Sequence, residues 1–432
     1  MDSLEYLFGL EFHGHKFGLE NIRALTDALG RPQVAYRTVS VAGTNGKGSV
    51  CAMVARALTA AGHRTGLYTS PHLVTLRERF VVNGEMVTDI EMATALDEVR
   101  AAIDRLLQHG GLRAQPTFFE VVTSMALVMF RRRLVEIAVL EVGLGGRLDA
   151  TTVATPTAGA ITTIDLDHQA HLGGTIRAIA AEKAGIAKPG MVVVCGERKP
   201  EAVDVIDDVC RRQGASLVKA WDGVDASASS IAGLTTITLR TPTRSYAPCT
   251  LALRGAHQVG NAVVAVRLLE ALDAAGVSVP PPAVVDGLTR TRWRGRLELV
   301  SFDDGREMLL DAAHNPAGAE CLAAYLRDTY PGGLPLVFGA MQDKDIEGML
   351  RALVPHATQM ILTSPPSRRS ASPADLGALI AALKPELPIQ IEPDPSTAIA
   401  CAFRSGRSIC VAGSIYLLGT ILSAIEPLKR RI

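Results

Sequence analysis

The fold is decided by one stretch, Thr38-Val39-Ser40-Val41-Ala42-Gly43-Thr44-Asn45-Gly46-Lys47-Gly48-Ser49. Its first five residues have the pattern of a buried strand, its last seven include three glycines, and a helical segment from Val50 to Ala61 follows. Glycines let backbone N–H groups turn toward a phosphate, while the helix dipole, Lys47 and the Ser49 hydroxyl favour phosphate and magnesium. The alternative is a glycine-rich turn before a core helix. Although Gly48 separates Lys47 from Ser49, unlike in the usual loop, the stretch predicts a nucleotide phosphate loop.

The composition is that of a globular protein. The 432 residues are too many for one ordinary core, so we expect two or more domains. Hydrophobic residues make up 48% and charged residues 20%, which excludes a disordered chain. Lys plus Arg and Asp plus Glu both total 44, so no net charge attracts nucleic acid or an anionic membrane. We therefore expect small-molecule partners, and neither nucleic acid nor membrane.

The sequence favours a cytoplasmic location. Residues 1–30 are interrupted by charged side chains and lack the apolar run of a signal peptide. No stretch reaches about 18 uncharged apolar residues, so we expect no membrane span. The cysteines are odd in number and form no C-x-x-C pair, and we interpret them as reduced and mostly buried. They are Cys51, Cys195, Cys210, Cys249, Cys321, Cys401 and Cys410.

Short Val- and Ile-rich runs alternate with Ala- and Leu-rich amphipathic segments, a pattern typical of a mostly parallel sheet covered by helices. The pattern breaks after Val277, at three prolines and an Arg-rich run, and then resumes. Alternating residues between Ser216 and Leu253 predict a small appended antiparallel strand pair. We predict an α/β protein with three parts: a phosphate-loop N-terminal domain at residues 1–290, a hinge at 291–297, and a smaller, Rossmann-like α/β C-terminal domain at 298–432.

Two further residues are candidates for a magnesium site, and a lysine follows them in the sequence. Glu141 ends a buried strand, where ligands gather in parallel sheets, so it can hold the metal as a Walker-B acid or simply cap the following turn. His168 also follows a strand, and the residues alone leave it either a metal ligand or a surface histidine. Lys183 lies beside Glu182 in an apolar helical run, a pattern that by itself favours a solvated helix face.

Further motifs follow one another in a fixed order. In the first domain they are Gly18-Leu19-Glu20-Asn21-Ile22, residues 43–49, Thr69-Ser70-Pro71-His72-Leu73 with Glu78-Arg79, Thr117-Phe118-Phe119-Glu120, residues 141–151, Leu166-Asp167-His168, residues 182–186, and His257-Gln258 with Asn261. In the second they are residues 295–298, 311–316, 343–345 and 413–416. Together they resemble one family over nearly the whole chain, the folylpolyglutamate synthases and dihydrofolate synthases of the Mur ligase superfamily. The spacing Gly-Lys-Gly-Ser is this family's own form of the phosphate loop.

The resemblance implies a role for each matching residue. The ATP phosphates would be held by Asn45, Gly46, Lys47, Gly48 and Ser49, and the remaining ATP contacts would be Asn261, Arg296 and Asp311. Magnesium, as two ions, would be ligated by Ser70, Glu141 and His168. Lys183 would be carbamylated by CO₂, which replaces its positive charge with a carboxylate-like group and requires an unprotonated amine.

The resemblance also implies the substrate contacts. The pterin-side pocket would be formed by Thr117, Phe118, Phe119, Glu120, Leu148, Asp149 and Ala150, and the incoming glutamate would be met by His314 and Ser414. Lys47, Lys183 and His314 would be the catalytic residues. The chain departs from the family's usual residues at Thr152, Arg294 and Ala312, none of which is a proposed ligand.

The implied function is ATP-dependent addition of L-glutamate to dihydropteroate, to folates, or to both, through an acyl phosphate, with the hinge closing over the site to exclude water. The alternatives are a single-activity folylpolyglutamate synthase, a ligase for another acid, a phosphate-loop NTPase without ligase activity, and an inactive homologue. Residues 11–17 can form part of a dihydropteroate loop or remain solvated. The family favours a monomer.

Overall fold

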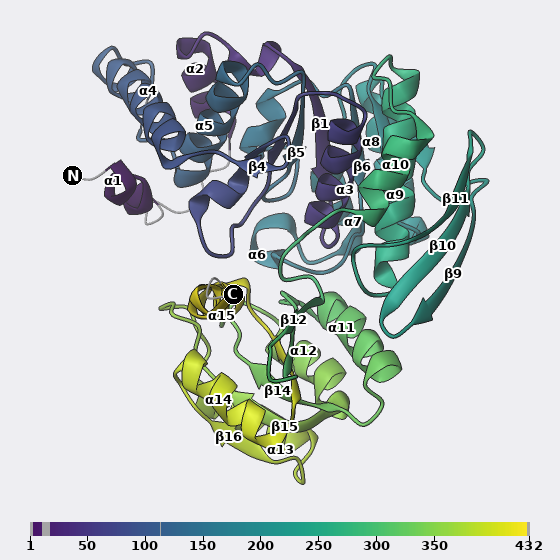
Figure 1. Ribbon diagram of the computed structural model, residues 1–432. Helices are drawn as coiled ribbons and strands as arrows, with labels where there is room; N and C mark the ends of the chain where they lie inside the picture. Colours follow the sequence, from purple (N-terminus) through teal and green to yellow (C-terminus); the bar gives the residue numbers. More distant parts are fainter. Residues whose placement is uncertain (1–2, 11–17, 113, 430–432) are drawn as a thin grey trace.

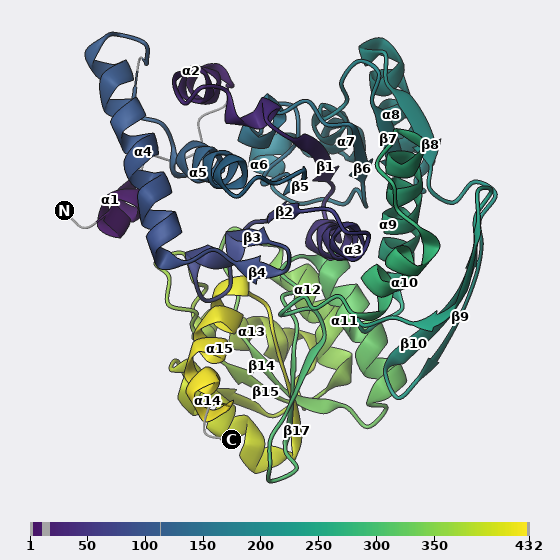
Figure 2. The same ribbon diagram turned by 45° about the horizontal axis from the view of Figure 1, so that its top comes forward.

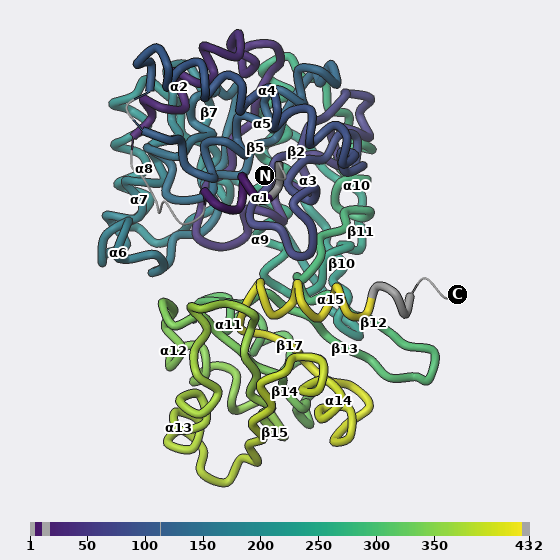
Figure 3. The backbone as a smooth tube through the Cα atoms, turned by 90° about the vertical axis from the view of Figure 1, so that its left-hand side faces the viewer, coloured from purple at the N-terminus to yellow at the C-terminus, as the bar shows by residue number. Residues whose placement is uncertain are grey.

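The computed structural model describes residues 3–10, 18–112 and 114–429. Figure 1 shows two α/β bodies, one above the other, with a small curved sheet beside the upper one. Figure 3, a view from the side, shows that the two bodies meet along one boundary. The chain crosses this boundary where the N-terminal body ends and the C-terminal body begins. In the described residues, no helix is both long enough and apolar enough to span a bilayer.

The larger sheet of the N-terminal body has eight strands in the described residues, in the order β4-β3-β2-β5-β1-β6-β7-β8. Only β3 runs opposite to the other strands, because it pairs antiparallel with both β2 and β4, so the parallel strands end at one edge. The strand with the phosphate loop, β1, lies between β5 and β6, with Val39 opposite Val139 on one side and Ala158 on the other. The strands are β1 (Arg37–Ala42), β2 (Thr65–Tyr68), β3 (Phe80–Val82), β4 (Glu85–Met86), β5 (Ile137–Glu141), β6 (Ala158–Ile161), β7 (Val192–Cys195) and β8 (Ser216–Lys219).

Helices cover both faces of this sheet because successive strand residues point to opposite sides. Val139 packs in one core with α3, α9 and α10, whereas Leu140 packs in another with α1, α2, α4 and α5. A third core joins β6 and β7 to α7 and α8. The helices are α1 (Ser3–Gly9), α2 (Glu20–Ala28), α3 (Lys47–Ala60), α4 (Asp89–Gln108), α5 (Phe118–Arg132), α6 (Gln169–Leu172), α7 (Ile176–Ala184), α8 (Pro200–Gln213), α9 (His257–Ala274) and α10 (Pro281–Thr289). Short 3₁₀ turns, η2 (Pro32–Val34), η3 (Leu76–Arg79) and η4 (Ala150–Val153), connect them.

The appended sheet differs from the predicted strand pair. Its described strands number three, in the order β11-β10-β9, and Figure 2 shows it beside α9 and α10. They are β9 (Asp225–Ile231), β10 (Leu234–Arg240) and β11 (Ser245–Thr250). Ser216–Lys219 is instead the edge strand of the larger sheet. The prediction missed β9 because nearly all of its residues are exposed, so the segment shows no apolar alternation.

The C-terminal body has a six-stranded sheet in the order β12-β13-β17-β14-β15-β16, parallel except for the edge pair β12 and β13. The strands are β12 (Glu298–Ser301), β13 (Glu307–Leu310), β14 (Leu334–Phe338), β15 (Ala357–Leu362), β16 (Ile389–Ile391) and β17 (Ser408–Ala412). One core packs α11 (Pro316–Thr329), α12 (Ile346–Leu353), the turn η5 (Val354–His356) and α13 (Pro373–Leu383) on one face, and another packs α14 (Pro395–Ser405) and α15 (Ile415–Lys429) on the other.

The connection between the bodies also corrects a detail of the sequence analysis. The prolines after Val279 do not break the helical pattern, because Pro281 and Pro282 occupy the first turn of α10, where proline is tolerated. The crossing itself runs from the end of α10 to the start of β12. Its Trp293 lies against the phosphate-loop helix, since a Cβ on Gly48 would meet the indole ring at 2.7 Å.

Candidate active site

The phosphate loop is a tight backbone turn at the carboxyl end of β1. Gly43 and Gly46 both have positive φ, 146° and 85°, a conformation that favours glycine. A side chain would also find no room, because a Cβ on Gly43 would clash with Thr162 and one on Gly46 with the amide of Asn261. The loop is therefore held against β6 and α9 with its N–H groups at the start of α3, the arrangement that receives a phosphate.

Lys47 is the first residue of α3 and bends back over its own loop. Its ammonium donates hydrogen bonds to the carbonyls of Gly43 at 3.0 Å and Thr44 at 3.1 Å. The side chain is half-buried and has no carboxylate partner among the described residues. Its positive charge is thus available to a phosphate that enters the loop.

Glu141, the last residue of β5, is a buried carboxylate with most of its acceptor sites unused. It is 5% exposed, and the hydrogen bond that its side chain accepts comes from the backbone N–H of Ser70, at 3.1 Å. Burial raises the pKa of Glu141, and the charge of Lys47 opposes the rise. No three His, Cys, Asp or Glu side chains of the described chain form a metal cluster, so a metal here would combine Glu141 with hydroxyl and phosphate oxygens, which suits magnesium.

Lys183 is a buried lysine that forms no ion pair with an acid in the part of the chain that the structure describes. It lies on α7, is 5% exposed, and donates to the carbonyl of Gly43 at 2.7 Å, so it meets the phosphate loop from the side opposite α3. Burial and, next, the charge of Lys47 lower the pKa of Lys183 to about 7. A large fraction of this amine is therefore unprotonated at neutral pH.

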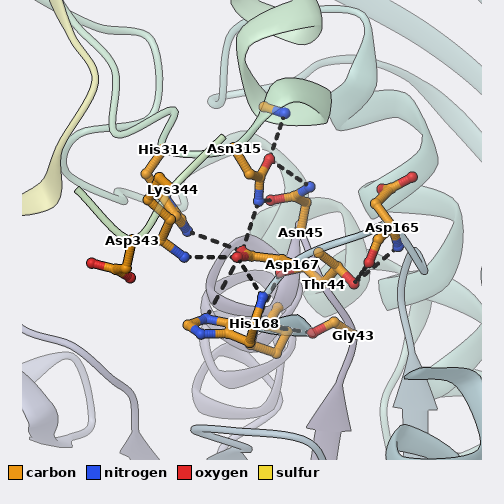
Figure 4. Close-up of polar contacts among 12 residues, drawn as sticks. Gly43, Thr44, Asn45, Asp165, Asp167, His168, His314, Asn315, Asp343 and Lys344 are labelled. Atoms are coloured by element: carbon orange, nitrogen blue, oxygen red, sulfur yellow. Dashed lines mark hydrogen bonds and ion pairs between the residues drawn. The ribbon is translucent and has the colours of Figure 1, made fainter. Parts of the chain in front are cut away.

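Asp167 joins the two bodies, as Figure 4 shows. It follows β6, and its carboxylate accepts hydrogen bonds from Lys344 at 2.7 Å and from Asn315 at 3.0 Å, both of the C-terminal body. Asn315 also exchanges amide hydrogen bonds with Asn45 of the phosphate loop, at 3.1 and 3.3 Å. Burial disfavours the Asp167 carboxylate, but the positive charges beside it, which include Lys344, hold its pKa well below the ordinary value.

Two histidines flank Asp167, one from each body. The Nε2 atoms of His168 and His314 each lie 3.8 Å from its carboxylate. Burial, and then the charge of Lys344, lower the pKa of both imidazoles to about 4, so they are neutral at pH 7. His314 Nδ1 is 2.8 Å from the carbonyl of Ala312, which can only accept, so the proton lies on Nδ1 and Nε2 is a free acceptor.

These groups surround a pocket of about 160 Å³ between the two bodies. The N-terminal body contributes the phosphate loop, Glu141, Lys183 and the start of α9. The C-terminal body contributes the segment from Asp311 to His314, and the connection between the bodies contributes Arg296. A phosphate loop, a buried carboxylate with open acceptor sites and a lysine of lowered pKa thus face residues from the other body across one pocket. This is an arrangement for a phosphoryl-transfer reaction that needs both bodies.

Comparison with known proteins agrees with this geometry. Residues 41–269 match the Mur ligase middle domain, and residues 295–415 match the Mur ligase glutamate ligase domain. The dihydrofolate synthase/folylpolyglutamate synthase of Bacillus subtilis is 34% identical over 82% of this chain and 82% of its own length. The chain belongs to the folylpolyglutamate synthase and dihydrofolate synthase family of Mur ligases.

Two solved structures of the family share the fold. The folylpolyglutamate synthase of Mycobacterium tuberculosis, complexed with ADP and AMPPCP, is 32% identical, covers 98% of both chains and superposes with a TM-score of 0.91. The bifunctional folylpolyglutamate synthase/dihydrofolate synthase of Yersinia pestis, complexed with AMPPNP and a Mn ion, is 28% identical, covers 98% of this chain and 97% of its own, and gives a TM-score of 0.84. The α/β fold expected from the sequence is confirmed.

The structure brings most of the predicted site residues of this family member into the pocket. Those that line it are Asn45, Gly46, Lys47, Gly48, Ser49, Ser70, Glu141, His168, Lys183, Asn261, Arg296, Asp311 and His314. Asp311 is partly engaged already, because its carboxylate accepts the backbone N–H groups of Leu297 and Ala313, both at 2.9 Å. It thereby fixes the backbone beside Arg296, whose charge lowers its pKa while burial raises it more.

The residues that the family resemblance assigns to the pterin side do not line this pocket. Thr117 and Glu120 form a capping box at the start of α5, with the Glu120 carboxylate bonded to the Thr117 N–H at 2.8 Å. Phe119, Leu148 and Ala150 gather in a small apolar cluster with α2. Asp149 is saturated by the turn that follows β5, and Phe118 packs near α1.

Ser414 is also outside the pocket, buried at the start of α15, where its hydroxyl accepts from the N–H of Tyr416 at 3.2 Å. Residues 11–17, the possible dihydropteroate loop, lie outside the described residues.

Sequence analysis left Asp167 and Lys344 without a role, although both lie in motifs that carry the resemblance. The sequence could have indicated a role for Asp167, because this acid follows a predicted strand at its carboxyl end and lies beside His168. Gln258 was missed as well. Its amide lies 2.8 Å from the Asn261 amide and thereby orients a residue of the phosphate-loop wall.

Proposed function

We propose that this chain is an ATP-dependent ligase that joins L-glutamate to dihydropteroate and to tetrahydrofolate or its polyglutamates, through an acyl phosphate, with release of ADP and phosphate. The observation that carries the proposal is the pocket in which the phosphate loop, the free side of Glu141 and the neutral His314 meet. The choice of acceptors is supported by the family, since the Bacillus relative is named as both a dihydrofolate synthase and a folylpolyglutamate synthase.

ATP would bind with its phosphates on residues 45–49, with Asn261, Arg296 and Asp311 completing the nucleotide site. The close fit of Gly46 against Asn261 and the presence of Arg296 in the pocket wall support this placement. Because Arg296 lies in the connection just before β12, its approach to the nucleotide would depend on how the two bodies meet.

Ser70, Glu141 and His168 would hold the divalent metal, which we assign as two Mg²⁺ ions. The unused oxygens of Glu141 and the free nitrogen of a neutral imidazole are donor groups that fit such an ion, and the Yersinia relative binds Mn²⁺ with its nucleotide. When bound, the metal offsets charge on the phosphoryl group in transfer.

Lys183 would be carbamylated. Carbamate formation needs an unprotonated amine, and the lowered pKa of this buried lysine supplies one near neutral pH. The product would be an anion beside Gly43 at the phosphate loop, where it could orient a metal ligand. It would also relieve the repulsion between two lysines that approach the same carbonyl.

In the first step the acceptor carboxylate attacks the γ-phosphorus and ADP leaves. The residues of the chain position the groups and balance charge: the N-terminus of α3 and Lys47 hold the phosphates, and Arg296 adds a second cation. The carboxylate itself is a poor electrophile, and the phosphate that it gains is the leaving group of the second step.

In the second step the amine of glutamate attacks the acyl carbon and phosphate leaves. His314 would receive the amino group, because its free Nε2 can accept a hydrogen bond from an ammonium or amine. Its lowered pKa makes it a weak proton acceptor, so we assign it to positioning the amine. Ser414 lies on the adjoining segment, where the N–H of Gly413 donates to the carbonyl of Ala313 at 3.1 Å.

Residues 291–297 would act as the hinge between domains 1–290 and 298–432. The ion pair between Lys344 and Asp167 and the amide pair between Asn315 and Asn45 then define a closed arrangement that excludes water from the acyl phosphate. Replacing Arg296 with alanine should lower turnover strongly, whereas the free energy of unfolding should change little.

The pterin side would be a wall of aromatic and apolar side chains, Phe118, Phe119, Leu148 and Ala150. Thr117, Glu120 and Asp149 support this wall through the capping box and the turn after β5. The apolar cluster around Phe119 is the observation that supports the assignment.

The test is to supply ATP, Mg²⁺ and L-glutamate with either dihydropteroate or tetrahydrofolate, and to follow phosphate release together with the mass of the product. Amide from both acceptors supports the bifunctional reading, and amide from tetrahydrofolate alone assigns a folylpolyglutamate synthase. Phosphate release that ignores glutamate and yields no amide would mean a phosphate-loop NTPase without ligase activity.

A further inference from the structure

Arg79 is a buried cation that has no acidic partner among the described residues. It is the last residue of η3 and is 6% exposed. Its Nε donates to Nδ1 of His72 at 3.0 Å, and no carboxylate of the described residues forms an ion pair with it. A guanidinium offers five N–H donors, and a buried charge is costly unless it is paired. One of its donors also meets the hydroxyl of Tyr68, and the others are available to an anion.

The adjacent acid does not neutralise this cation. The carboxylate of Glu78 accepts the backbone N–H groups of Leu73, Val74 and Thr75, each at 2.8 Å, and so is committed to the turn that precedes η3. The same bonds fix the backbone on which Arg79 stands. The arginine is thus held in place by the chain while its charge is left uncompensated.

Arg79 adjoins both the aromatic wall and the phosphate-loop side. Its guanidinium carbon lies 5.3 Å from the ring centroid of Phe118, which in turn stacks with Phe8 at 6.3 Å. On the other side, the carbonyl of Arg79 accepts the N–H of Thr69 at 3.3 Å, and the next N–H along the chain, that of Ser70, donates to Glu141 at 3.1 Å. An acceptor with an aromatic ring at one end and a carboxylate at the other needs an apolar surface for the ring and a cation near the phosphate loop for the carboxylate. Arg79 and Phe118 provide these two features side by side.

We propose that Arg79 binds the carboxylate of the acceptor, the group that is to be phosphorylated, and holds it toward the phosphate loop while the ring system rests on Phe118. This rests on the proposed function and deepens it. The planar fork of arginine matches the two oxygens of a carboxylate, and burial strengthens the contact. Arg79 is then a substrate-binding residue that selects acids over uncharged analogues.

The test compares dihydropteroate with its carboxamide, which has the same shape without the charge. Binding of each to the whole chain is measured by calorimetry without ATP. The variants are Arg79→Gln and Arg79→Lys, and the matched control is Arg77→Gln, which removes the same charge from the same turn, where Arg77 pairs with the exposed Asp89 at 3.2 Å.

The wild-type chain and the Arg77→Gln control should bind the acid about 10- to 100-fold tighter than the amide. Arg79→Gln should lose this preference by weakening the acid alone, and Arg79→Lys should restore part of it, with KM for ATP unchanged. The proposal is overturned if Arg79→Gln weakens acid and amide equally or keeps the preference. If the glutamine variant fails to fold, equal affinity of the wild type for acid and amide overturns it.

Failure of the proposed function looks different. A wild-type chain that makes the amide product while Arg79→Gln keeps its preference overturns the role of Arg79 alone. A wild-type chain that binds neither acceptor and makes no amide overturns both.

Discussion

Glu141 and Asp149 are buried to the same extent, each 5% exposed, and both lie at the carboxyl end of β5, Glu141 as its last residue and Asp149 in the turn that follows. Burial raises the pKa of both carboxyls. Their partners differ. Asp149 accepts the N–H groups of Gly143 and Leu144, both at 3.0 Å, and the N–H and hydroxyl of Thr151 at 3.0 and 2.6 Å. Glu141 accepts only the N–H of Ser70, within the described residues.

The difference teaches that burial and pKa do not separate a binding carboxylate from a structural one, whereas the count of its partners does. A carboxylate has about four acceptor sites. The acceptor sites of Asp149 are occupied by N–H and hydroxyl groups of the turn after β5. Most acceptor sites of Glu141, which lines the pocket, have no hydrogen-bond partner among the described residues. We therefore propose that Asp149 maintains the site and that Glu141 acts in it.

The largest expected effect comes from Glu141→Gln. The open oxygens would lose their charge, so turnover should fall on the order of 100- to 1000-fold, as for loss of a group that stabilises transition-state charge. The free energy of unfolding should stay within about 1 kcal/mol, because removing a buried charge with one hydrogen bond costs the fold little. Phosphate release and urea unfolding measure the two. A turnover within twofold of wild type would contradict the assignment.

Lys183 provides the next largest effect. Its lowered pKa, about 7, means that the neutral amine is the minor form at pH 6 and the major form at pH 8, so carbamylation should increase as pH rises through 7. With ¹³C-labelled bicarbonate, a carbamate NMR signal should follow that rise and be absent in Lys183→Arg. Removing bicarbonate at pH 8 should lower turnover about 10- to 100-fold. The same turnover with and without bicarbonate would count against carbamylation.

Asp149→Asn should act on the fold instead of the chemistry. The amide would keep one acceptor and turn N–H donors toward backbone N–H groups, so the free energy of unfolding should fall by about 2 to 3 kcal/mol. Urea unfolding measures the loss, and Mn²⁺ titration of the folded variant should give wild-type affinity. Wild-type stability together with lost metal binding would reverse the comparison between the two acids.

The smallest effect is expected at Glu120, a second acid whose carboxylate is already bonded to a nearby backbone N–H, that of Thr117. Glu120→Ala removes the capping box and should cost about 1 kcal/mol of unfolding free energy. If Glu120 is only a cap, KM for the acceptor should be unchanged in steady-state assays. A KM raised tenfold at unchanged stability would make it a direct substrate contact.

The sequence predicts those parts of the site that depend on local pattern. Lys47 and Glu141 could be placed because glycine spacing marks the loop and because parallel strands end at one edge. Lys183 could not be interpreted from its neighbours, which favoured a solvated face, and only the family resemblance predicted its place at the site. The structure supplies the reason, since α7 turns this residue toward Gly43.

Other parts depend on contacts that no local pattern encodes. Asp167 and Lys344 are 177 residues apart, and their ion pair exists only because the two bodies meet. The strand β9 gave no signal because it is exposed on both faces and is stabilised by pairing with β10. The prolines before α10 were misread because proline both interrupts a helix and begins one.

The central claim is that an acyl phosphate links ATP cleavage to amide formation in this pocket. The most direct test uses an acceptor with ¹⁸O in both carboxylate oxygens, together with ATP, Mg²⁺ and L-glutamate. If the carboxylate attacks the γ-phosphorus, one labelled oxygen leaves with the released phosphate and the other remains in the amide. The account predicts phosphate carrying one ¹⁸O for each amide formed. Unlabelled phosphate accompanying the amide would contradict it.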